Sequence, residues 1–240
     1  MSVDVSRPAR AAAIGHGFYL AMALLMAGVI FAGFAQTYPA SLAGSPPLPW
    51  LLHLHGAIFA TWVLLFVAQP ALAVRGSRRA HRLLGWVGAA LAAAMVVMGI
   101  LAVRVALIAH VGLTFLPRRI FVMGNLITVL VFAGLVAAAI LRRRQPDWHR
   151  RLMLCATIAL MTQALGRLLP LDGFGAAAPL ALFGVLDLFA LAGPAFDLVT
   201  RGRVHPAYLW GVGAILLMEA LIPAIAFSPA APTVIRLLSA

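Results

Sequence analysis

The sequence consists of long apolar runs that alternate with short stretches rich in arginine, proline and small polar residues. A helix needs about 20 residues to cross a hydrocarbon core of about 30 Å, and seven runs reach that length. Because hydrocarbon requires every backbone group to be bonded internally, such runs predict helices. We therefore expect an all-α, polytopic membrane protein with a single membrane domain, residues 1–240. Its seven transmembrane helices are expected at about residues 12–35, 50–74, 82–109, 118–141, 150–169, 176–200 and 206–227.

Composition agrees with this pattern. Apolar residues make up 64% and charged residues 10% of the 240 positions. A soluble domain is about half apolar and about a quarter charged. The chain therefore lacks the polar surface that a separate soluble domain needs, and the lipid bilayer is its expected surrounding.

The net charge of +12 comes from arginine alone, because the 18 basic residues include no lysine. Thirteen of these arginines lie in the amino-terminal segment and in three basic loops, at about residues 75–82, 142–151 and 201–205. Such a distribution sets topology in a bacterial inner membrane. We expect a cytoplasmic amino terminus, a periplasmic carboxyl terminus and no nucleic-acid partner.

Two classes of site are excluded by single residue types. Without lysine the chain cannot hold retinal through a Schiff base. Cys155 is the only cysteine, so neither an intramolecular disulfide nor a CxxC metal site can form.

The second apolar run contains two histidines near its start, His53 and His55. Ionisable groups in a membrane span are costly and usually face the interior of the bundle. His55 shares one helix face with Trp62 and Gln69, since the three are spaced by seven residues. His53 lies about 200° away around the helix. We predict that His55 faces the interior and that His53 does not.

The other polar residues of the apolar runs concentrate in the periplasmic halves of the expected helices and near their middle. The cytoplasmic halves are almost purely apolar, apart from His16 and Gln69. This segregation predicts a periplasm-facing ionisable pocket. Its expected members are Asn125, Gln163, Arg167, Asp187 and Glu219.

Two interpretations of this pocket remain open. Arg167 is expected to pair with one of the two acids, with Glu219 the preferred partner, since an unpaired guanidinium is expensive in a membrane. Acids and arginines that neutralise each other can also serve only to fix the packing of the helices. The histidines that close the three basic loops, His81, His149 and His205, are expected to be interfacial groups.

A haem-b or quinone-linked redox protein is the first functional candidate. Bis-histidine haem needs two imidazoles at matching depth on facing helices, with cations nearby for the propionates. His55, or His53, with His110 is the expected ligand pair. The arginines available for the propionates are Arg104, Arg118, Arg119 and Arg167.

Two segments carry resemblances to known proteins. RRAHRLLGW and DWHRRLML are similar to segments of uncharacterised bacterial multi-pass inner-membrane proteins. The histidines near helix ends resemble those of cytochrome b561-type haem proteins, and this resemblance implies haem b as a cofactor. Three alternatives remain: a transporter or binding protein for a small anion or lipid, an intramembrane hydrolase with zinc on His55, Asp187 and Glu219, and an accessory subunit of a membrane complex.

Overall fold

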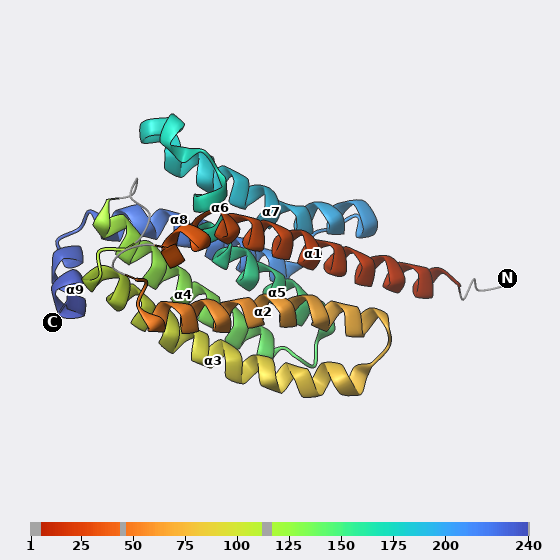
Figure 1. Ribbon diagram of the computed structural model, residues 1–240. Helices are drawn as coiled ribbons and strands as arrows, with labels where there is room; N and C mark the ends of the chain where they lie inside the picture. Colours follow the sequence, from red (N-terminus) through yellow and green to blue (C-terminus); the bar gives the residue numbers. More distant parts are fainter. Residues whose placement is uncertain (1–5, 44–46, 112–116, 240) are drawn as a thin grey trace.

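The computed structural model describes residues 6–43, 47–111 and 117–239, and these ranges are all-α (Figure 1). Nine α-helices and one 3₁₀ helix, η1, form within them. The elements are α1 (Ser6–Ala43), α2 (Trp50–Val74), α3 (Arg78–Ile108), α4 (Arg118–Leu141), α5 (Pro146–Leu160), α6 (Thr162–Leu168), η1 (Leu171–Ala177), α7 (Ala178–Arg201), α8 (Pro206–Ala226) and α9 (Ala230–Ser239).

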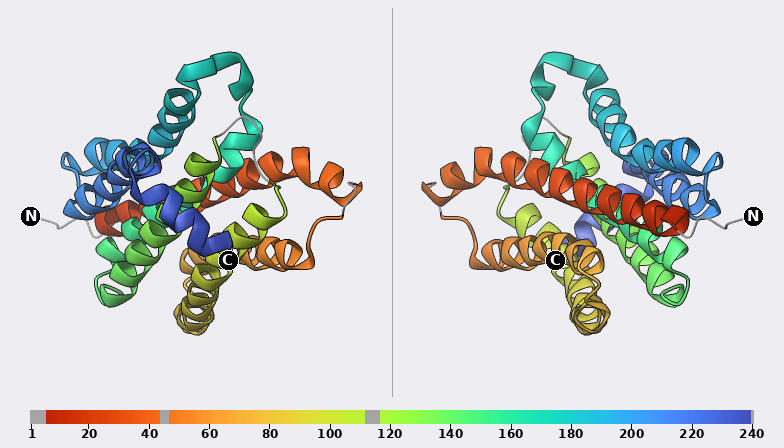
Figure 2. Two further views of the ribbon diagram at one scale, coloured as in Figure 1. Left: turned by 90° about the vertical axis from the view of Figure 1, so that its left-hand side faces the viewer. Right: turned by 90° about the vertical axis from the view of Figure 1, so that its right-hand side faces the viewer.

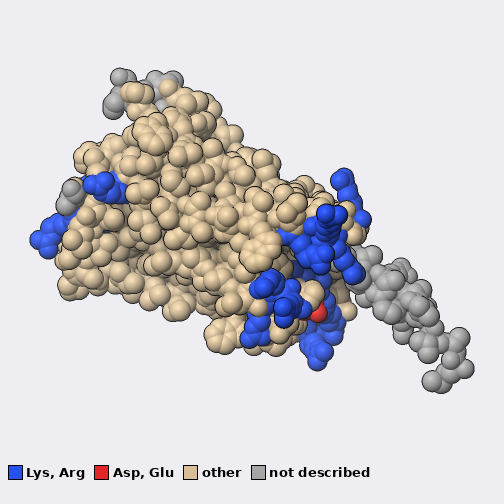
Figure 3. All heavy atoms as spheres, turned by 90° about the horizontal axis from the view of Figure 1, so that it is seen from below, with Lys and Arg blue, Asp and Glu red and all other residues tan. Residues whose placement is uncertain are grey.

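Six of the described helices are long and apolar enough to cross a membrane, namely α1, α2, α3, α4, α7 and α8. Their outer faces carry large apolar side chains, such as Leu180, Val199 and Leu209, which are 76%, 86% and 72% exposed. Surface of this kind suits lipid rather than water. In Figure 3 the arginines gather towards the two ends of the molecule, and the described residues between them on that face are uncharged. A multi-pass membrane protein is thus the fold class.

Proline and glycine explain where several helices begin and end. Helices α2 and α4 start directly after Pro49 and Pro117. Helices α5 and α8 start with Pro146 and Pro206, whose fixed φ suits the first turn of a helix and whose missing N–H costs nothing there. Helix α7 ends at Gly202, which has a φ of 69° in the left-handed region.

Two helices are longer than the apolar pattern predicts. Helix α1 covers residues 6–43 rather than 12–35, and it continues through Pro39. A proline in a helix removes one backbone donor, and here that loss does not end the helix. Helix α3 begins at Arg78 rather than residue 82, directly after Ser77.

The expected fifth helix, residues 150–169, consists of two helices, α5 and α6, that meet at Met161. The Met161 N–H donates to the Ile158 carbonyl (2.9 Å), which is a 3₁₀ contact. The Thr162 hydroxyl donates to the Ala159 carbonyl (2.8 Å). A tighter turn and a side-chain hydroxyl therefore replace the regular backbone pattern at this point.

The ends of the helices sort by charge. Helix α1 begins at the same end of the molecule as the α2–α3, α4–α5 and α7–α8 connections, whereas η1 and α9 lie at the opposite end (Figure 1). We refer to the first as the basic end, because the three connections are the basic loops. Figure 2 gives the two end-on views of this arrangement.

Helix α5 is the centre of the bundle. It packs against α1, α4, α7 and α8, and residues 154–159 are all buried. The bundle is held together by close approaches at small residues, as membrane helices generally are. Gly88 and Ala92 of α3 are buried, and Gly88 packs against Leu65. Gly33 of α1 packs directly on the backbone of Ala164, so a side chain there would collide with α6.

Candidate functional site

A small cavity lies where α4, α6, α7 and α8 meet, in the half of the bundle away from the basic loops. Its volume is about 60 Å³, which is room for a few water molecules or one small ion. Its polar lining residues are Asn125, Thr128, Thr162 and Gln163. Two members of the expected pocket, Asn125 and Gln163, therefore do line one cavity.

Local structure directs these side chains towards the cavity. The break between α5 and α6 comes immediately before Thr162 and Gln163, so both lie at the start of a new helix rather than inside a continuous one. Asn125 Nδ2 donates to the Phe121 carbonyl (2.7 Å). The Thr128 hydroxyl donates weakly to the Met218 sulfur (3.5 Å).

Asp187 of α7 and Glu219 of α8 lie beside this cavity. Each is one helical turn from a lining residue, Phe183 and Ile222 respectively. The two carboxyl groups are close enough to influence each other electrostatically. One oxygen of each, Asp187 Oδ1 and Glu219 Oε1, is buried without a hydrogen-bond partner among the described residues.

Ion pairing does not explain these two acids. All the ion pairs found among the described residues involve Asp147 or Asp197 and lie at the basic end. Two neighbouring carboxylates without a cation cannot both be ionised in a low-dielectric region, because each ion is poorly solvated and repels the other. Such a pair is chemically suited to hold a proton, a small cation or both.

The expected pairing of Arg167 with Glu219 is wrong. The Arg167 guanidinium donates to the Gln163 carbonyl (2.7 Å) and lies over the ring of Phe34, 4.5 Å from its centroid. Helix α6 packs mainly against α1, so Arg167 points to the α1 side of the bundle and not to α8. Arg167 is close enough to His55 of α2 for its charge to act on that imidazole.

The two histidines of α2 face different neighbours, in agreement with the helical-phase prediction. His53 Nδ1 lies 2.8 Å from the Tyr38 hydroxyl at the exposed edge between α1 and α2. His55 packs against Phe59, with ring centroids 4.2 Å apart, and approaches the Met98 backbone of α3. Its Nδ1 is buried without a partner in the described part of the chain.

The remaining residues expected to serve haem lie at the α3–α4 connection and do not converge on His55. His110 is exposed, with a φ of 53°, and Arg104 is exposed on α3. Arg118 donates to the Leu107 carbonyl (3.0 Å), and Arg119 lies over Phe227, 5.4 Å from its ring centroid.

The residues expected to bind zinc are not brought together either. Within the described ranges no three histidine, cysteine, aspartate or glutamate side chains come together as metal ligands. His55, Asp187 and Glu219 therefore do not form a zinc site in this fold.

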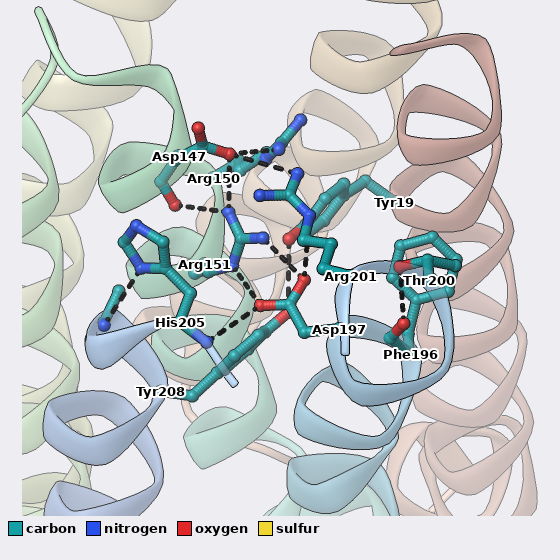
Figure 4. Close-up of polar contacts among 11 residues, drawn as sticks. Tyr19, Asp147, Arg150, Arg151, Phe196, Asp197, Thr200, Arg201, His205 and Tyr208 are labelled. Carbon is teal, nitrogen blue, oxygen red and sulfur yellow. Dashed lines mark hydrogen bonds and ion pairs between the residues drawn. The ribbon is translucent and has the colours of Figure 1, made fainter. Parts of the chain in front are cut away.

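A second polar cluster, which the sequence did not predict, lies at the basic end (Figure 4). Arg151 of α5 and Asp197 of α7 are both fully buried, with 0% exposure. Arg151 Nη2 donates to Asp197 Oδ1 (2.6 Å) and Nε donates to Oδ2 (2.8 Å), which makes a bidentate pair. The expectation that the cytoplasmic halves are almost purely apolar is thus wrong at α5 and α7.

Asp147 extends the cluster to the surface. It accepts hydrogen bonds from Arg150 and Arg151 and forms an ion pair with Arg201 (3.3 Å). Partial burial alone raises the pKa of Asp147. The hydrogen bond from Arg151 and the charges of Arg150 and Arg201 outweigh it, and the resulting pKa is about 2.

Aromatic and helix-capping contacts complete the cluster. The Tyr19 and Tyr208 hydroxyls are 3.1 Å apart and join α1 to α8. Tyr208 passes so close to Gly193 that a methyl group there would collide with its ring. Asp197 also accepts the His205 N–H (3.2 Å), and His205 Nδ1 in turn accepts the Ala207 N–H (3.1 Å) at the start of α8.

Helical phase was the signal that could have revealed Asp197. The buried residues of α7 form one stripe at helical spacing, Leu182, Leu186, Ala190, Gly193 and Asp197. Asp197 continues this apolar stripe and is therefore directed inward. In the sequence, its partner Arg151 belongs to a basic loop. Arg151 is buried because α5 lies at the centre of the bundle.

Comparison with known proteins adds no assignment: no protein-family model, no curated protein and no solved structure matches this chain.

Proposed function

We propose that this chain is a seven-pass inner-membrane protein that binds a proton or a small cation between α7 and α8. The seventh crossing is residues 150–168 of α5 and α6, which are helical apart from the break at Met161. A segment of that length suffices to cross the bilayer. Helix α1 begins at the basic end and α9 lies at the opposite end, as an odd number of crossings requires (Figure 1).

The orientation is amino terminus inside. The basic end carries the three arginine-rich loops, which the positive-inside rule assigns to the cytoplasm. Reporter fusions at Arg78 and Ser45 test this proposal directly. We expect a cytoplasmic signal from Arg78 and a periplasmic signal from Ser45, and the reverse pattern would invert every depth assigned to the polar residues.

The binding function rests on one observation, the unpaired carboxyl oxygens of Asp187 and Glu219, which lie one helical turn from residues that line a small cavity. Ionisable residues in a membrane are usually functional. The break in the α5–α6 segment supports the same proposal, since transporters commonly form their sites near the middle of the membrane from interrupted helices. A proton or small-cation transporter or binding protein is therefore the favoured class.

The other candidate classes have less support. An anion site at this cavity lacks its anchor, because Arg167 lies on the α1 side of the bundle. A haem at the periplasmic histidines lacks converging partners for His55. A zinc hydrolase lacks a three-residue ligand set among the described residues.

Labelling with dicyclohexylcarbodiimide tests the proposal, because this reagent modifies protonated carboxyl groups in apolar surroundings. The protein in detergent is treated at several pH values with and without Na⁺, and labelled residues are identified by mass spectrometry. We expect modification of Glu219 or Asp187, with protection by Na⁺ if the ligand is a cation and by high pH alone if it is a proton.

The exposed Asp172 is the internal control and should stay unlabelled. The variants Glu219→Gln and Asp187→Asn separate the two carboxyl groups. Labelling that is absent at both acids at every pH, in a folded protein, would contradict the proposed function.

A further inference from the structure

The arginines of the basic end fall into two groups. Arg150, Arg151 and Arg201 form ion pairs with aspartates. The arginines at the α2–α3 connection and the start of α3 are exposed and have no acid partner among the described residues. This second group consists of Arg75, Arg78, Arg79 and Arg82. The α2–α3 side of the basic end therefore carries positive charge that the described part of the chain does not neutralise.

An open hollow lies among these unpaired arginines. Its volume is about 380 Å³, and its lining residues are Ser77, Arg79, Ala80 and Leu83. The lining is thus polar on one side and apolar on the other. Such a boundary at the end of a membrane bundle suits an amphipathic ligand, whose charged group lies at the arginine and whose apolar part continues past the leucine.

An exposed apolar stripe continues from this hollow along α3. Leu83, Trp86, Ala90 and Val97 follow Arg79 at helical spacing, so the five side chains share one helix face. All of them are exposed. Helix α3 also lies at the periphery of the bundle in both end-on views (Figure 2). The stripe is therefore open to lipid from the hollow towards the middle of the helix.

A further cation is held beside the stripe by the α4–α5 connection. The Arg143 guanidinium lies over the Trp86 ring, 5.7 Å from its centroid, and Nη1 donates to the Ile140 carbonyl (3.2 Å). Arg82 precedes Trp86 by one helical turn. Tryptophan is favoured at the level of lipid headgroups. Guanidinium groups bind phosphate with two parallel hydrogen bonds, so this level of α3 offers several donors for one phosphate.

We propose that this surface of α3 binds one anionic phospholipid. The phosphate lies at Arg79 and Arg82, and an acyl chain follows the stripe that begins at Leu83. Basic surfaces of this kind, on the cytoplasmic side of membrane helices, recognise anionic headgroups. The occupant is a lipid and not a free phosphate ion, because the apolar stripe is continuous with the hollow. The leaflet follows from the orientation proposed above, whereas the site itself does not depend on that orientation.

Native mass spectrometry of the full-length protein in detergent tests the site. The probes are phosphatidylglycerol, which is anionic, and phosphatidylcholine, which has no net charge, with the same acyl chains. We expect one phosphatidylglycerol to be retained under conditions that remove phosphatidylcholine. Arg79→Gln and Arg82→Gln should each weaken this binding about fivefold, as expected for the loss of one cation near an anionic headgroup.

Arg203→Gln is the matched control. Arg203 is an exposed arginine on the α7–α8 connection, so this variant loses the same charge at the same end of the molecule but away from α3. Its binding of phosphatidylglycerol should be unchanged. Thermal unfolding in phosphatidylcholine shows whether each variant is folded, and Arg79→Ala and Arg82→Ala replace any that is not.

Fluorescence quenching locates the acyl chain. Brominated acyl chains quench tryptophan on contact, and brominated phosphatidylglycerol should quench more than brominated phosphatidylcholine. Trp86→Phe should remove most of that difference. Trp50→Phe changes an exposed tryptophan at the opposite end of the bundle and should not.

Four results would overturn the proposal. Equal retention of the two lipids would show that the surface does not select charge, and equal losses in Arg79→Gln and Arg203→Gln would show only a general effect of net charge. Displacement of the lipid by inorganic phosphate would indicate a site for a free anion. Quenching that is undiminished in Trp86→Phe would place the lipid elsewhere. Carbodiimide labelling of Glu219 should persist in Arg79→Gln, so the acid pair and the lipid surface are tested separately.

Discussion

Asp197 and Asp187 lie on the same helix, α7, about three turns apart, yet their surroundings are opposite. Asp197 is fully buried and receives two hydrogen bonds from Arg151 and one from the His205 backbone. Asp187 is partly buried and has an oxygen with no partner in the described structure. The same residue type is therefore paired at the basic end of α7 and has an unpaired oxygen near the middle of this helix.

This difference separates a structural role from a functional one. A charge whose hydrogen-bonding capacity is filled by neighbouring helices contributes to the packing of those helices. A charge that the protein leaves unpaired is costly, and a cost of this kind is usually retained for binding or proton transfer. Substitutions in the Asp197 region should therefore lower stability, whereas substitutions of the unpaired acids should mainly affect binding.

Removing one member of the buried ion pair should have the largest effect. Arg151→Leu removes the buried counter-charge of Asp197 and leaves it only the ion pair with the partly exposed Arg201, whose Nε lies 3.5 Å from Oδ1. Loss of one partner of a buried ion pair costs about 3–5 kcal/mol. We expect a large fall in the thermal midpoint in detergent, and Asp197→Leu should behave alike. Arg167→Leu is the matched control, since Arg167 pairs with no described acid and its loss strands none.

The double variant Arg151→Leu/Asp197→Leu sharpens this test. It removes both charges, so part of the lost stability should return relative to either single variant. Equal destabilisation by Arg151→Leu and Arg167→Leu would show that the two regions do not differ as proposed.

The close packing around Tyr208 should give the next largest effect. Gly193→Ala places a methyl group against the Tyr208 ring and threatens the Tyr19–Tyr208 contact. Overpacking of this kind costs about 1–3 kcal/mol. Gly184→Ala on the same helix is the control, because a methyl group there meets no neighbour within 4 Å. Thermal unfolding should therefore separate the two glycine variants; similar midpoints would argue against tight packing at Gly193.

The apolar pattern predicted the membrane fold because length and hydropathy alone decide which segments enter lipid. Boundaries were accurate at α2 and α4, where Pro49 and Pro117 mark the helix starts. The break at Met161 was not predicted, because it depends on the Thr162 hydroxyl bonding to a carbonyl of the preceding turn. Propensity alone does not report such a competition.

The candidate site was predicted in part. Depth along each helix groups Asn125 with Gln163, and these two residues line one cavity. Depth does not give the direction of a side chain around its helix, and for that reason Arg167 was assigned to the wrong neighbours.

Neutralising the unpaired acids should have a small effect on stability and a large one on binding. Asp187→Asn and Glu219→Gln remove charges that the protein does not pair. We therefore expect the free energy of unfolding to change by less than about 1 kcal/mol, in the direction of higher stability. Asp197→Asn is the matched control, and this variant should lose far more stability than the other two. Thermal unfolding of the three variants measures this; a collapse of Glu219→Gln comparable to that of Asp197→Asn would assign Glu219 a structural role.

The smallest expected effect concerns acid stability at the basic end. The pKa of Asp147 is about 2 in the folded protein, below its ordinary value of about 4. A lowered folded-state pKa means that the unfolded chain binds the proton more readily, so the contribution of Asp147 to stability is fully present above about pH 4 and is lost as the pH falls towards 2. Because the Asp147 side chain is 48% exposed, solvent weakens its ion pairs and the shift in midpoint should be modest.

Thermal unfolding between pH 2 and pH 7 should show Asp147→Asn less stable than the natural protein at neutral pH, with the two curves converging in acid. Parallel curves would indicate that Asp147 does not take part in the charge network, whereas the Arg151–Asp197 pair would be unaffected by that result.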